Sequence, residues 1–448
     1  MAKPFPQTIA EAQGSFLEGL SPLDIVTACL DRIQERNDKL GAMIFVARCD
    51  ALEEAQEAEA AIRAGKRIGP LHGIPVAVKD VIDVRGWQTT GGSRLFDEND
   101  ALSDASCVAN LRSAGAIIIG KTNLHELTAG NHDNPWYGKV VNPLDQVRGT
   151  GGTSSGSAAA VAAGFCFAAI GTDTGGSNRS TAAATGLVGF KPTNGVIDPT
   201  GTMPTAPTFD TIGPIARNVA DARLLHYVMA GIDPPEAKSV SVAGMRIGLC
   251  PKLYAAAVDP AIATAHDAFL ASAQRAGAQI QVLPFQFARE VRETGLTILM
   301  YEFTVHYGQF VEANPERVGA AVRDFLSNGA SISAAAYQSA LASRAQMQSE
   351  FERMSLGIDV LATPVVPGLA PRLSDELTAV GEDFVPYGLA GGHFRRWANF
   401  FGVPTLAMPI PMPGALPASI QITTPKNSES YLFSACEALS RLETGSAN

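Results

Sequence analysis

Two clusters of glycine, serine and threonine lie close together in the sequence, at residues 148–157 and 171–179. Glycine lets the backbone adopt positive φ and lets a ligand approach closely, and hydroxyl side chains supply nucleophiles. In the second cluster, GTDTGGSNR, several consecutive backbone N–H groups surround Ser177, as an oxyanion-stabilising turn requires. Ser177 is therefore the predicted nucleophile, and the competing interpretation is a turn serine in a glycine-rich connection.

A lysine in an apolar setting is the second candidate for chemistry. The segment Ile74–Val84, IPVAVKDVIDV, is typical of a buried strand and carries Lys79 among valines. Burial disfavours the ammonium form, so it would turn this amine into a general base near neutral pH. The alternative is an ammonium group that reaches solvent or pairs with Asp80 or Asp83.

The composition excludes several classes of protein. Of the 448 residues, 46% are apolar and 17% are charged, which is typical of a globular chain with a sizeable core. The formal net charge of −10 argues against a nucleic-acid partner, because binding to phosphates depends on Lys and Arg. The N-terminus lacks the apolar segment of a signal peptide, and the longest nearly apolar stretch, 158–170, is too short to span a membrane. We therefore expect a cytoplasmic protein without a membrane partner.

No pattern in the sequence predicts a metal or a cofactor. The six cysteines are scattered without CxxC spacing, and the seven histidines show no HExxH arrangement. Residues 115–122, GAIIIGKT, match the P-loop expression, but their β-branched interior favours a core strand over a loop that cradles phosphate. We expect neither a metal nor a cofactor.

Apolar periodicity predicts an α/β protein. Helical spacing dominates residues 8–64, and strands alternate with helices over 74–119 and 245–283, which favours a parallel or mixed sheet. Residues 291–351 are mostly helical, and 400–422 predict two closing strands. We divide the chain into an N-terminal helical segment packed on the core, the core itself, a more variable and mostly helical α/β region, and a C-terminal segment that returns to the core, all within one compact domain. These parts are residues 1–68, 69–235, 236–345 and 346–448.

Five motifs resemble the amidase signature family of serine hydrolases, in the order LHGIPVAVKD, GAIIIGKTN, GTGGTSSGSAAAVAAG, AIGTDTGGSNR and GLVGFKPT. The resemblance covers residues 69–219, and weaker features continue in TPVVP and ANFFGVPTLAMPIP. It implies the amidase signature fold, a large mixed central β-sheet surrounded by α-helices. It also implies a triad of a serine, a serine at a cis peptide bond and a lysine, and Ser177 and Lys79 match two of its members.

The third position of that triad departs from the family pattern. Where the family has GGSSGGS, this chain has GGTSSGS at residues 151–157, so Thr153 stands 24 residues before Ser177, the offset that the resemblance implies. A threonine hydroxyl can relay a proton as a serine hydroxyl does, and Ser154 is the alternative relay. The simpler interpretation of Thr153 to Ser155 is an N-cap for the helix that follows.

The resemblance assigns further roles around Ser177. Lys79 would accept a proton through Thr153 as Ser177 attacks an amide carbonyl. The predicted oxyanion donors are the backbone N–H groups of Thr174, Gly175, Gly176 and Ser177. We interpret Asp173 and Arg179 as a structural pair that holds this turn. The supporting residues are Ser154, Ser155, Asp173 and Arg179.

The expected reaction is hydrolysis of a carboxamide or related C–N bond of a small molecule through an acyl-serine, with release of ammonia or an amine. The candidate pocket residues, whose aromatic members would suit an apolar acyl group, are Asn131, His132, Tyr307, Phe394, Trp397 and Phe401. One alternative is the glutamine-amidase component of a tRNA-dependent amidotransferase. The short chain and its GHFRRWANFFGVP stretch argue against this alternative. The other is a catalytically impaired binding or scaffold subunit, suggested by Thr153. A homodimer or a partner subunit is compatible with these interpretations.

Overall fold

The computed structural model describes residues 5–66, 69–236, 238–254, 258–380, 383–414 and 416–442. Its strands are β1 (Met43–Val46), β2 (Pro75–Lys79), β3 (Ile117–Thr122), β4 (Ala168–Thr172), β5 (Val188–Lys191), β6 (Ile212–Ala216), β7 (Arg246–Leu249), β8 (Gln279–Val282), β9 (Val360–Pro364), β10 (Leu377–Val380), β11 (Asp383–Pro386), β12 (Thr405–Ile410) and β13 (Ala418–Thr423). Within the described residues, β10 and β11 form a separate hairpin and the other eleven strands form one mixed sheet.

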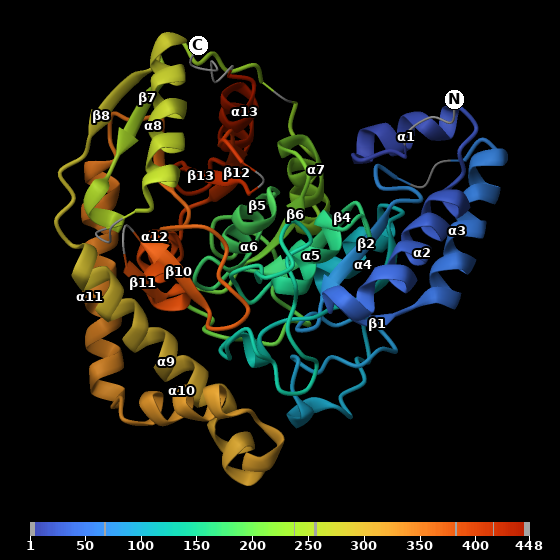
Figure 1. The fold of residues 1–448 in the computed structure, drawn as a ribbon, viewed down its shortest axis with the longest axis horizontal. Helices are drawn as coiled ribbons and strands as arrows, with labels where there is room; N and C mark the ends of the chain where they lie inside the picture. The colour runs from blue at the N-terminus through green and yellow to red at the C-terminus, as the bar shows by residue number, and fades with distance from the viewer. Residues whose placement is uncertain are drawn as a thin grey trace.

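Helices surround this sheet (Figure 1). They are α1 (Ile9–Leu17), α2 (Pro22–Leu40), α3 (Arg48–Arg63), α4 (Ser106–Ser113), α5 (Ser155–Ala162), α6 (Ser177–Thr185), α7 (Val219–Ala230), α8 (Pro260–Arg275), α9 (Ala288–Ala313), α10 (Ala320–Ala330), α11 (Ala334–Met354), α12 (Tyr387–Phe401) and α13 (Glu429–Ser440). Figure 1 shows α1 to α3 at one end of the molecule and α9 to α11 at the other. In the part of the chain that the structure describes, no helix is both long and apolar enough to cross a membrane.

The sheet is antiparallel through its middle and parallel on either side of it, except that the edge strand β1 pairs antiparallel with β3. The strand order is β1-β3-β2-β4-β6-β5-β12-β13-β9-β7-β8. Strand β2 pairs in parallel with both β3 and β4, and β7 pairs in parallel with β8 and β9. The pairs from β4 to β9 across the middle are antiparallel. The predicted large mixed sheet is thus confirmed.

Both faces of the sheet are covered, and β2 shows how its side chains are divided. Val76 and Val78 pack into one apolar cluster, with side chains of α4, α7, α8 and α13. Ala77, between them, packs into the opposite cluster, with side chains of α3 and α5. This alternation is the period of two expected for a strand buried on both faces.

The structure shortens one predicted strand in a way that matters for the site. β2 ends at Lys79 rather than continuing to Val84, because the backbone N–H groups of Val81 and Ile82 turn back and donate to the carbonyl of Lys79 at 2.8 and 3.0 Å. Lys79 is therefore the last residue of β2 and lies where this interior strand leaves the sheet. The GAIIIGKT run forms the predicted strand, β3, and is no phosphate loop.

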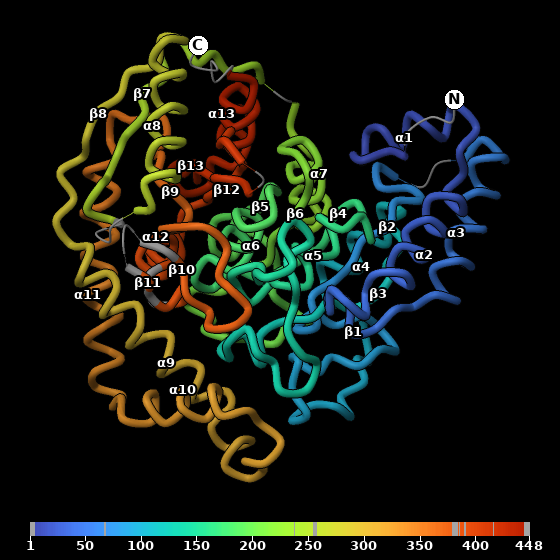
Figure 2. Tube along the Cα trace, viewed as in Figure 1, coloured from blue at the N-terminus to red at the C-terminus, as the bar shows by residue number. Residues whose placement is uncertain are grey.

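Several elements were not predicted from periodicity, among them β1, β5, β6, α6, α12 and α13. Two of the helices build the site. α6 follows β4 directly, and α12 packs against both α6 and α9 although it is far from α6 in the sequence (Figure 2).

Candidate active site

The candidate site lies at the carboxyl ends of the neighbouring interior strands β2 and β4. Because these neighbouring strands are parallel, their carboxyl ends meet at the same edge. Lys79 is the last residue of β2 and Thr172 is the last residue of β4. Two helices begin nearby, α5 at Ser155 and α6 at Ser177. The two clusters of the sequence are thus brought to one lysine.

Lys79 is fully buried, with 0% of its surface exposed. Its ammonium donates to three hydroxyl oxygens, those of Thr153 at 3.0 Å, Ser154 at 3.1 Å and Thr172 at 2.8 Å. Burial lowers the pKa of Lys79 to about 7, and the attraction of nearby aspartates only partly opposes this shift. The amine is therefore close to half neutral at physiological pH.

The alternative in which Lys79 pairs with the next residue is wrong. Asp80 pairs instead with Lys121 of β3, with Oδ1 and Nζ 3.0 Å apart and both side chains 1% exposed. Lys121 also donates to the carbonyl of Ile82 at 2.7 Å. Two buried lysines thus lie on adjacent strands, and of these two only Lys121 forms an ion pair within the described residues.

Thr153 connects Lys79 to Ser177. Its hydroxyl accepts from Lys79 and donates to Oγ of Ser177 at 2.9 Å. The two hydroxyl residues are 24 positions apart, as the motif spacing indicated. The cis peptide bond that the resemblance implied is not present, since all described peptide bonds are trans. The line of hydrogen bonds from amine to serine forms without it.

Ser154 contacts Lys79, as a supporting residue would, but neither Ser154 nor Ser155 acts as the cap or the relay that the sequence offered as alternatives. The hydroxyl of Ser154 accepts from Lys79 and donates to the backbone carbonyl of Thr172 at 3.0 Å, so its proton is directed away from Ser177. Ser154 occupies the N-cap position of α5, but its side chain makes no capping bond. The hydroxyl of Ser155 is buried without a partner among the described residues. Neither serine is the relay that connects to Ser177.

The turn before Ser177 depends on one left-handed residue. Gly176 has φ of 104°, a conformation that a side chain disfavours, and a methyl group there would collide with the stem of Arg395. The N–H of Gly176 donates to Oδ1 of Asp173 at 2.8 Å. This bond removes Gly176 from the four predicted oxyanion donors. Thr174, Gly175 and Ser177 all line the cavity beside the turn.

Asp173 and Arg179 form the fully buried pair that we expected to hold this turn. Nε and Nη2 of Arg179 donate to the two carboxylate oxygens, each at 3.0 Å. The remaining donors reach Gln421 at 2.7 Å and Asn399 at 2.8 Å. Burial raises the pKa of Asp173, but Arg179 and Asn399 outweigh this effect and hold the pKa at about 2. The carboxylate thus stays ionised and fully bonded.

A cavity of about 320 Å³ opens over Ser177 and Thr153. One of its walls comes from α12 and from the segment before it. That wall carries Glu376, Tyr387, Gly388, Arg395 and Arg396. Phe325 and Leu299 add apolar surface. The cavity therefore combines polar and apolar groups and contains two arginines, in contrast to the aromatic pocket expected from the sequence.

The predicted pocket residues divide accordingly. Asn131 lines the cavity, and His132 lies behind it, where Nδ1 is 3.1 Å from Oε2 of Glu376. The other four are core residues outside the lining, so their assignment to the pocket is wrong. They are Tyr307, Phe394, Trp397 and Phe401. For the three residues of α12 the reason is the orientation of that helix, which stacks Phe401 on Phe351 with ring centroids 4.1 Å apart and turns its arginines to the cavity. Tyr307 belongs to α9, where it packs in the core and donates to the carbonyl of Pro204.

The sequence contained a signal for the missed wall. Arg395 and Arg396 are adjacent charges in YGLAGGHFRRWANFF, a helix whose other residues, apart from His393 and Asn399, are aromatic, small or apolar. Charged residues are almost never fully buried unless paired, so two of them in such a helix indicate either a partner or a ligand. The sequence around Glu376 gave no comparable indication, because the place of Glu376 in the cavity wall depends on how the hairpin of β10 and β11 packs.

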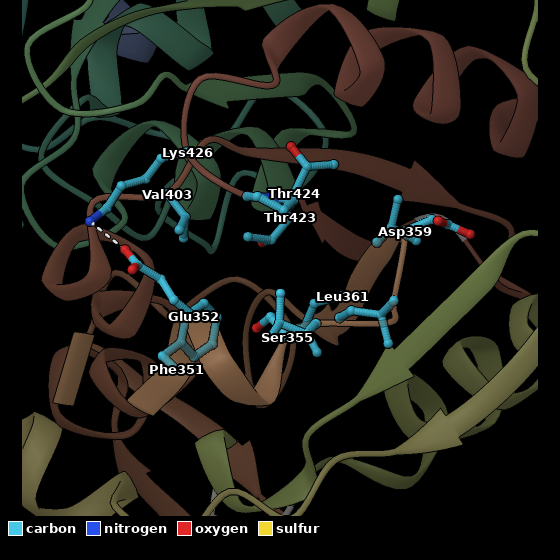
Figure 3. Close-up of a pocket in the computed structure, with 13 residues that line it drawn as sticks. Phe351, Glu352, Ser355, Asp359, Leu361, Val403, Thr423, Thr424 and Lys426 are labelled. Carbon is cyan, nitrogen blue, oxygen red and sulfur yellow. Dashed lines mark hydrogen bonds and ion pairs between the residues drawn. The ribbon is translucent and has the colours of Figure 1, made fainter. Parts of the chain in front are cut away.

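A second cavity of about 290 Å³ lies beside the end of α11 (Figure 3). Phe351, Leu361 and Val403 give it a mainly apolar lining, and Glu352 lies 3.0 Å from Lys426 at its side. Its lining includes neither Ser177 nor Lys79. The candidate site is therefore the cavity that Ser177 and Thr153 line.

Comparison with known proteins agrees with this fold and site. The family model described as Amidase matches residues 24–433. The A-type subunit of the glutamyl-tRNA(Gln) amidotransferase of Anaeromyxobacter dehalogenans is 32% identical over 469 aligned positions, covering 96% of this chain and 94% of that protein. The chain belongs to the amidase signature family, whose members hydrolyse C–N bonds.

Two solved structures illustrate the range of the likeness. A crystal structure of an amidase superposes with a TM-score of 0.91 at 30% identity, covering 97% of this chain and all 100% of that one. The A-type subunit of the glutamyl-tRNA(Gln) amidotransferase of Thermotoga maritima superposes with a TM-score of 0.76 at 26% identity, covering 96% of this chain and 94% of that one. The chain thus resembles both kinds of enzyme along nearly its whole length.

Proposed function

We propose that the protein hydrolyses a carboxamide of a small molecule through an acyl-Ser177 intermediate and releases ammonia or an amine. The observation that carries the proposal is the line of hydrogen bonds from Lys79 through Thr153 to Ser177. Neutral Lys79 accepts the proton of the Thr153 hydroxyl, which takes the proton of Ser177 as its Oγ attacks the amide carbonyl. A base with a pKa of about 7 suits this transfer at neutral pH.

The remaining steps use the same groups. The developing oxyanion accepts from the N–H groups of Thr174, Gly175 and Ser177, and such a donor contributes roughly 3 to 4 kcal/mol to stabilising the transition state. The proton returns from Lys79 through Thr153 to the leaving nitrogen. Water then attacks the ester of Ser177, gives up its proton along the same path, and frees the acid.

A serine-directed probe and an ammonia assay test the proposal together. A fluorophosphonate should modify Ser177, identified by mass spectrometry of the modified peptide, and should fail to modify the Ser177→Ala variant. Ammonia release is then measured over aliphatic, aryl and urea-like amides. Modification at a different residue, or undiminished ammonia release by Ser177→Ala, contradicts the proposal.

A second candidate is glutamine hydrolysis that supplies ammonia to a tRNA-dependent amidotransferase. The similarity to the A-type subunit of glutamyl-tRNA(Gln) amidotransferase, at 32% identity over most of both chains, favours it. A requirement for a partner subunit would support this role. It is tested by glutamine hydrolysis by the purified chain, with and without the other amidotransferase subunits added. Ammonia release from glutamine only in their presence would select this candidate.

The small-molecule amidase is supported by the higher TM-score to the amidase structure, 0.91 against 0.76 for the amidotransferase subunit. The impaired-subunit alternative, which Thr153 suggested, predicts ligand binding without any modification of Ser177 by the probe.

We also place the activity in the cytoplasm, since all six cysteines are free thiols, as a reducing compartment would keep them.

A further inference from the structure

The cavity wall formed by α12 contains a buried cation, Arg395, two of whose donors have no hydrogen-bond partner among the described residues. Arg395 lines the cavity and is 6% exposed, yet its Nε and Nη1 are buried with no hydrogen-bond partner among the described residues. Neither Arg395 nor Arg396 has a carboxylate within ion-pair distance in the described part of the chain. A buried guanidinium without a counter-charge is costly, so its presence requires an explanation.

Two glycines of α12 leave the space that the guanidinium groups of these arginines occupy. A methyl group at Gly391 would collide with Nη1 of Arg395, and one at Gly392 would lie 2.7 Å from Nη1 of Arg396. Each glycine stands four residues before its arginine on α12, so each guanidinium lies back along the helix over the preceding turn. The ring of Tyr387 lies 5.5 Å from the guanidinium carbon of Arg395, which adds a cation–π contact. The sequence therefore makes room for both cations.

The other charged groups around the cavity do not neutralise the arginines. Glu376 on the same wall is paired with His132, and the hydrogen bond to Glu376 raises the pKa of His132, which favours the charged pair. Asp173, on the far side of the turn, has both oxygens bonded to Arg179. Burial raises the pKa of Tyr387 to about 12, so this phenol stays neutral. The cavity is left with a net positive charge.

We propose that Arg395 and Arg396 form a carboxylate-binding subsite, so that the substrate is the monoamide of a small dicarboxylic acid. This assignment rests on the proposed amidase function. The free carboxylate accepts from the guanidinium groups while the amide carbonyl reaches Ser177. A planar guanidinium suits a carboxylate, since it can donate two parallel bonds to it.

The same charges distinguish this substrate from glutamine. Glutamine carries the carboxylate of glutaramate together with an α-ammonium group. Because Glu376 already pairs with His132, the cavity lacks a free anion for that ammonium among the described residues. We therefore expect glutaramate to be preferred over glutamine, although the two molecules differ only in that group.

The first experiment measures ammonia release from matched amides. Malonamate, succinamate and glutaramate are each compared with the neutral amide of the same length, which are propionamide, butyramide and valeramide. The wild-type enzyme should prefer the best anionic amide over its neutral counterpart by about 30-fold or more in kcat/KM. Equal rates on the two series, with turnover still dependent on Ser177, would overturn the subsite and leave the proposed function intact.

Arginine variants locate the preference. Arg395→Gln and Arg396→Gln should each reduce the anionic-to-neutral ratio of kcat/KM by about tenfold or more, mainly through KM for the anionic amides. Arg292→Gln is the matched control, because Arg292 contacts His393 of α12 at 3.1 Å but does not line the cavity. An unchanged ratio in both cavity variants would exclude the arginines.

A glycine variant tests the assignment without removing a charge. Gly391→Ala should displace the guanidinium of Arg395 and lower the anionic-to-neutral ratio severalfold. Alanine is also the better helix former, so the melting temperature should stay equal or rise. A lower ratio in a protein of undiminished stability cannot be attributed to misfolding. An unchanged ratio would contradict the placement of Arg395.

Two further outcomes separate the subsite from the proposed function. Faster release of ammonia from glutamine than from glutaramate would overturn the preference for a net anion and favour the glutamine-amidase alternative. If no amide is hydrolysed, the proposed function fails, and the subsite is then measured by calorimetry of Ser177→Ala with glutarate and valerate. Binding of glutarate alone supports the subsite, and binding of neither contradicts it.

Discussion

The two sides of the active-site cavity treat buried positive charge in opposite ways. Beside the turn, Arg179 donates to both oxygens of Asp173 and to Gln421 and Asn399, so its charge and its donors are fully used. On α12, Arg395 is nearly as deeply buried and lacks such partners among the described residues. A paired charge serves to hold a structure, whereas an unpaired one is available to a ligand. The comparison therefore separates the buried charge that fixes the turn of the nucleophile from the buried charge that is available to the substrate.

The largest expected effect is the loss of turnover when the nucleophile is removed, and it should leave ligand binding intact. Ser177→Ala should reduce ammonia release by roughly 10⁴-fold or more, because the nucleophile is lost. Binding of a dicarboxylate product should survive, since the α12 wall is unchanged. Ser180→Ala is the control, as its buried hydroxyl on the same helix has no partner among the described residues. Loss of binding together with turnover would show that the two walls do not act separately.

The next effect concerns stability and compares the two arginines directly. Arg179→Met leaves the buried Asp173 without its counter-charge and should lower the free energy of unfolding by about 3 to 5 kcal/mol. Arg395→Met removes a charge that has no partner among the described residues, so it should leave the free energy of unfolding unchanged or raise it. Urea unfolding of both variants measures the difference. A similar loss in both would mean that Arg395 is structurally paired after all.

The catalytic residues could be predicted from sequence because each lies in a compact local motif. Ser177 follows β4 by a short glycine turn, and Lys79 is marked by charge within an apolar run. The relay through Thr153 needed only the motif spacing. For Ser177 and Lys79 the information that places the residue lies in its immediate sequence neighbours, and for Thr153 it lies in the offset from Ser177.

The substrate wall could not be predicted, because it depends on packing between distant segments. Whether Trp397 or Arg395 faces the cavity is decided by how α12 rotates against α9 and α6, which periodicity does not determine. Aromatic residues were therefore assigned to a pocket that arginines line. The end of β2 at Lys79 is a similar case, since the valine and isoleucine beyond it continue the apolar pattern while the backbone turns.

The pH dependence of turnover tests the role of Lys79 as the base, and the expected effect is smaller. Lys79 acts as a base only when neutral, so kcat/KM should rise about tenfold from pH 6 to pH 8 around its pKa of about 7 and then level off. The folded pKa lies below the ordinary value of 10.5, so the unfolded chain binds the extra proton between these values. Stability should therefore increase with pH across that window, and Lys79→Met should remove both dependences. A rate that falls as pH rises through 7 would contradict the neutral base.

The smallest effect concerns the hydroxyl that joins the two catalytic side chains. Thr153→Ser keeps the oxygen that accepts from Lys79 and donates to Ser177 at 2.9 Å, and it removes one methyl group, so ammonia release should be retained or raised within about fivefold. Thr153→Val is the matched control, because it keeps the shape and removes the hydroxyl, and it should lose most activity. If valine supports turnover as well as serine does, the proton must reach Lys79 by another route. Ser154 is poorly placed to supply it, since its own proton is donated to the carbonyl of Thr172.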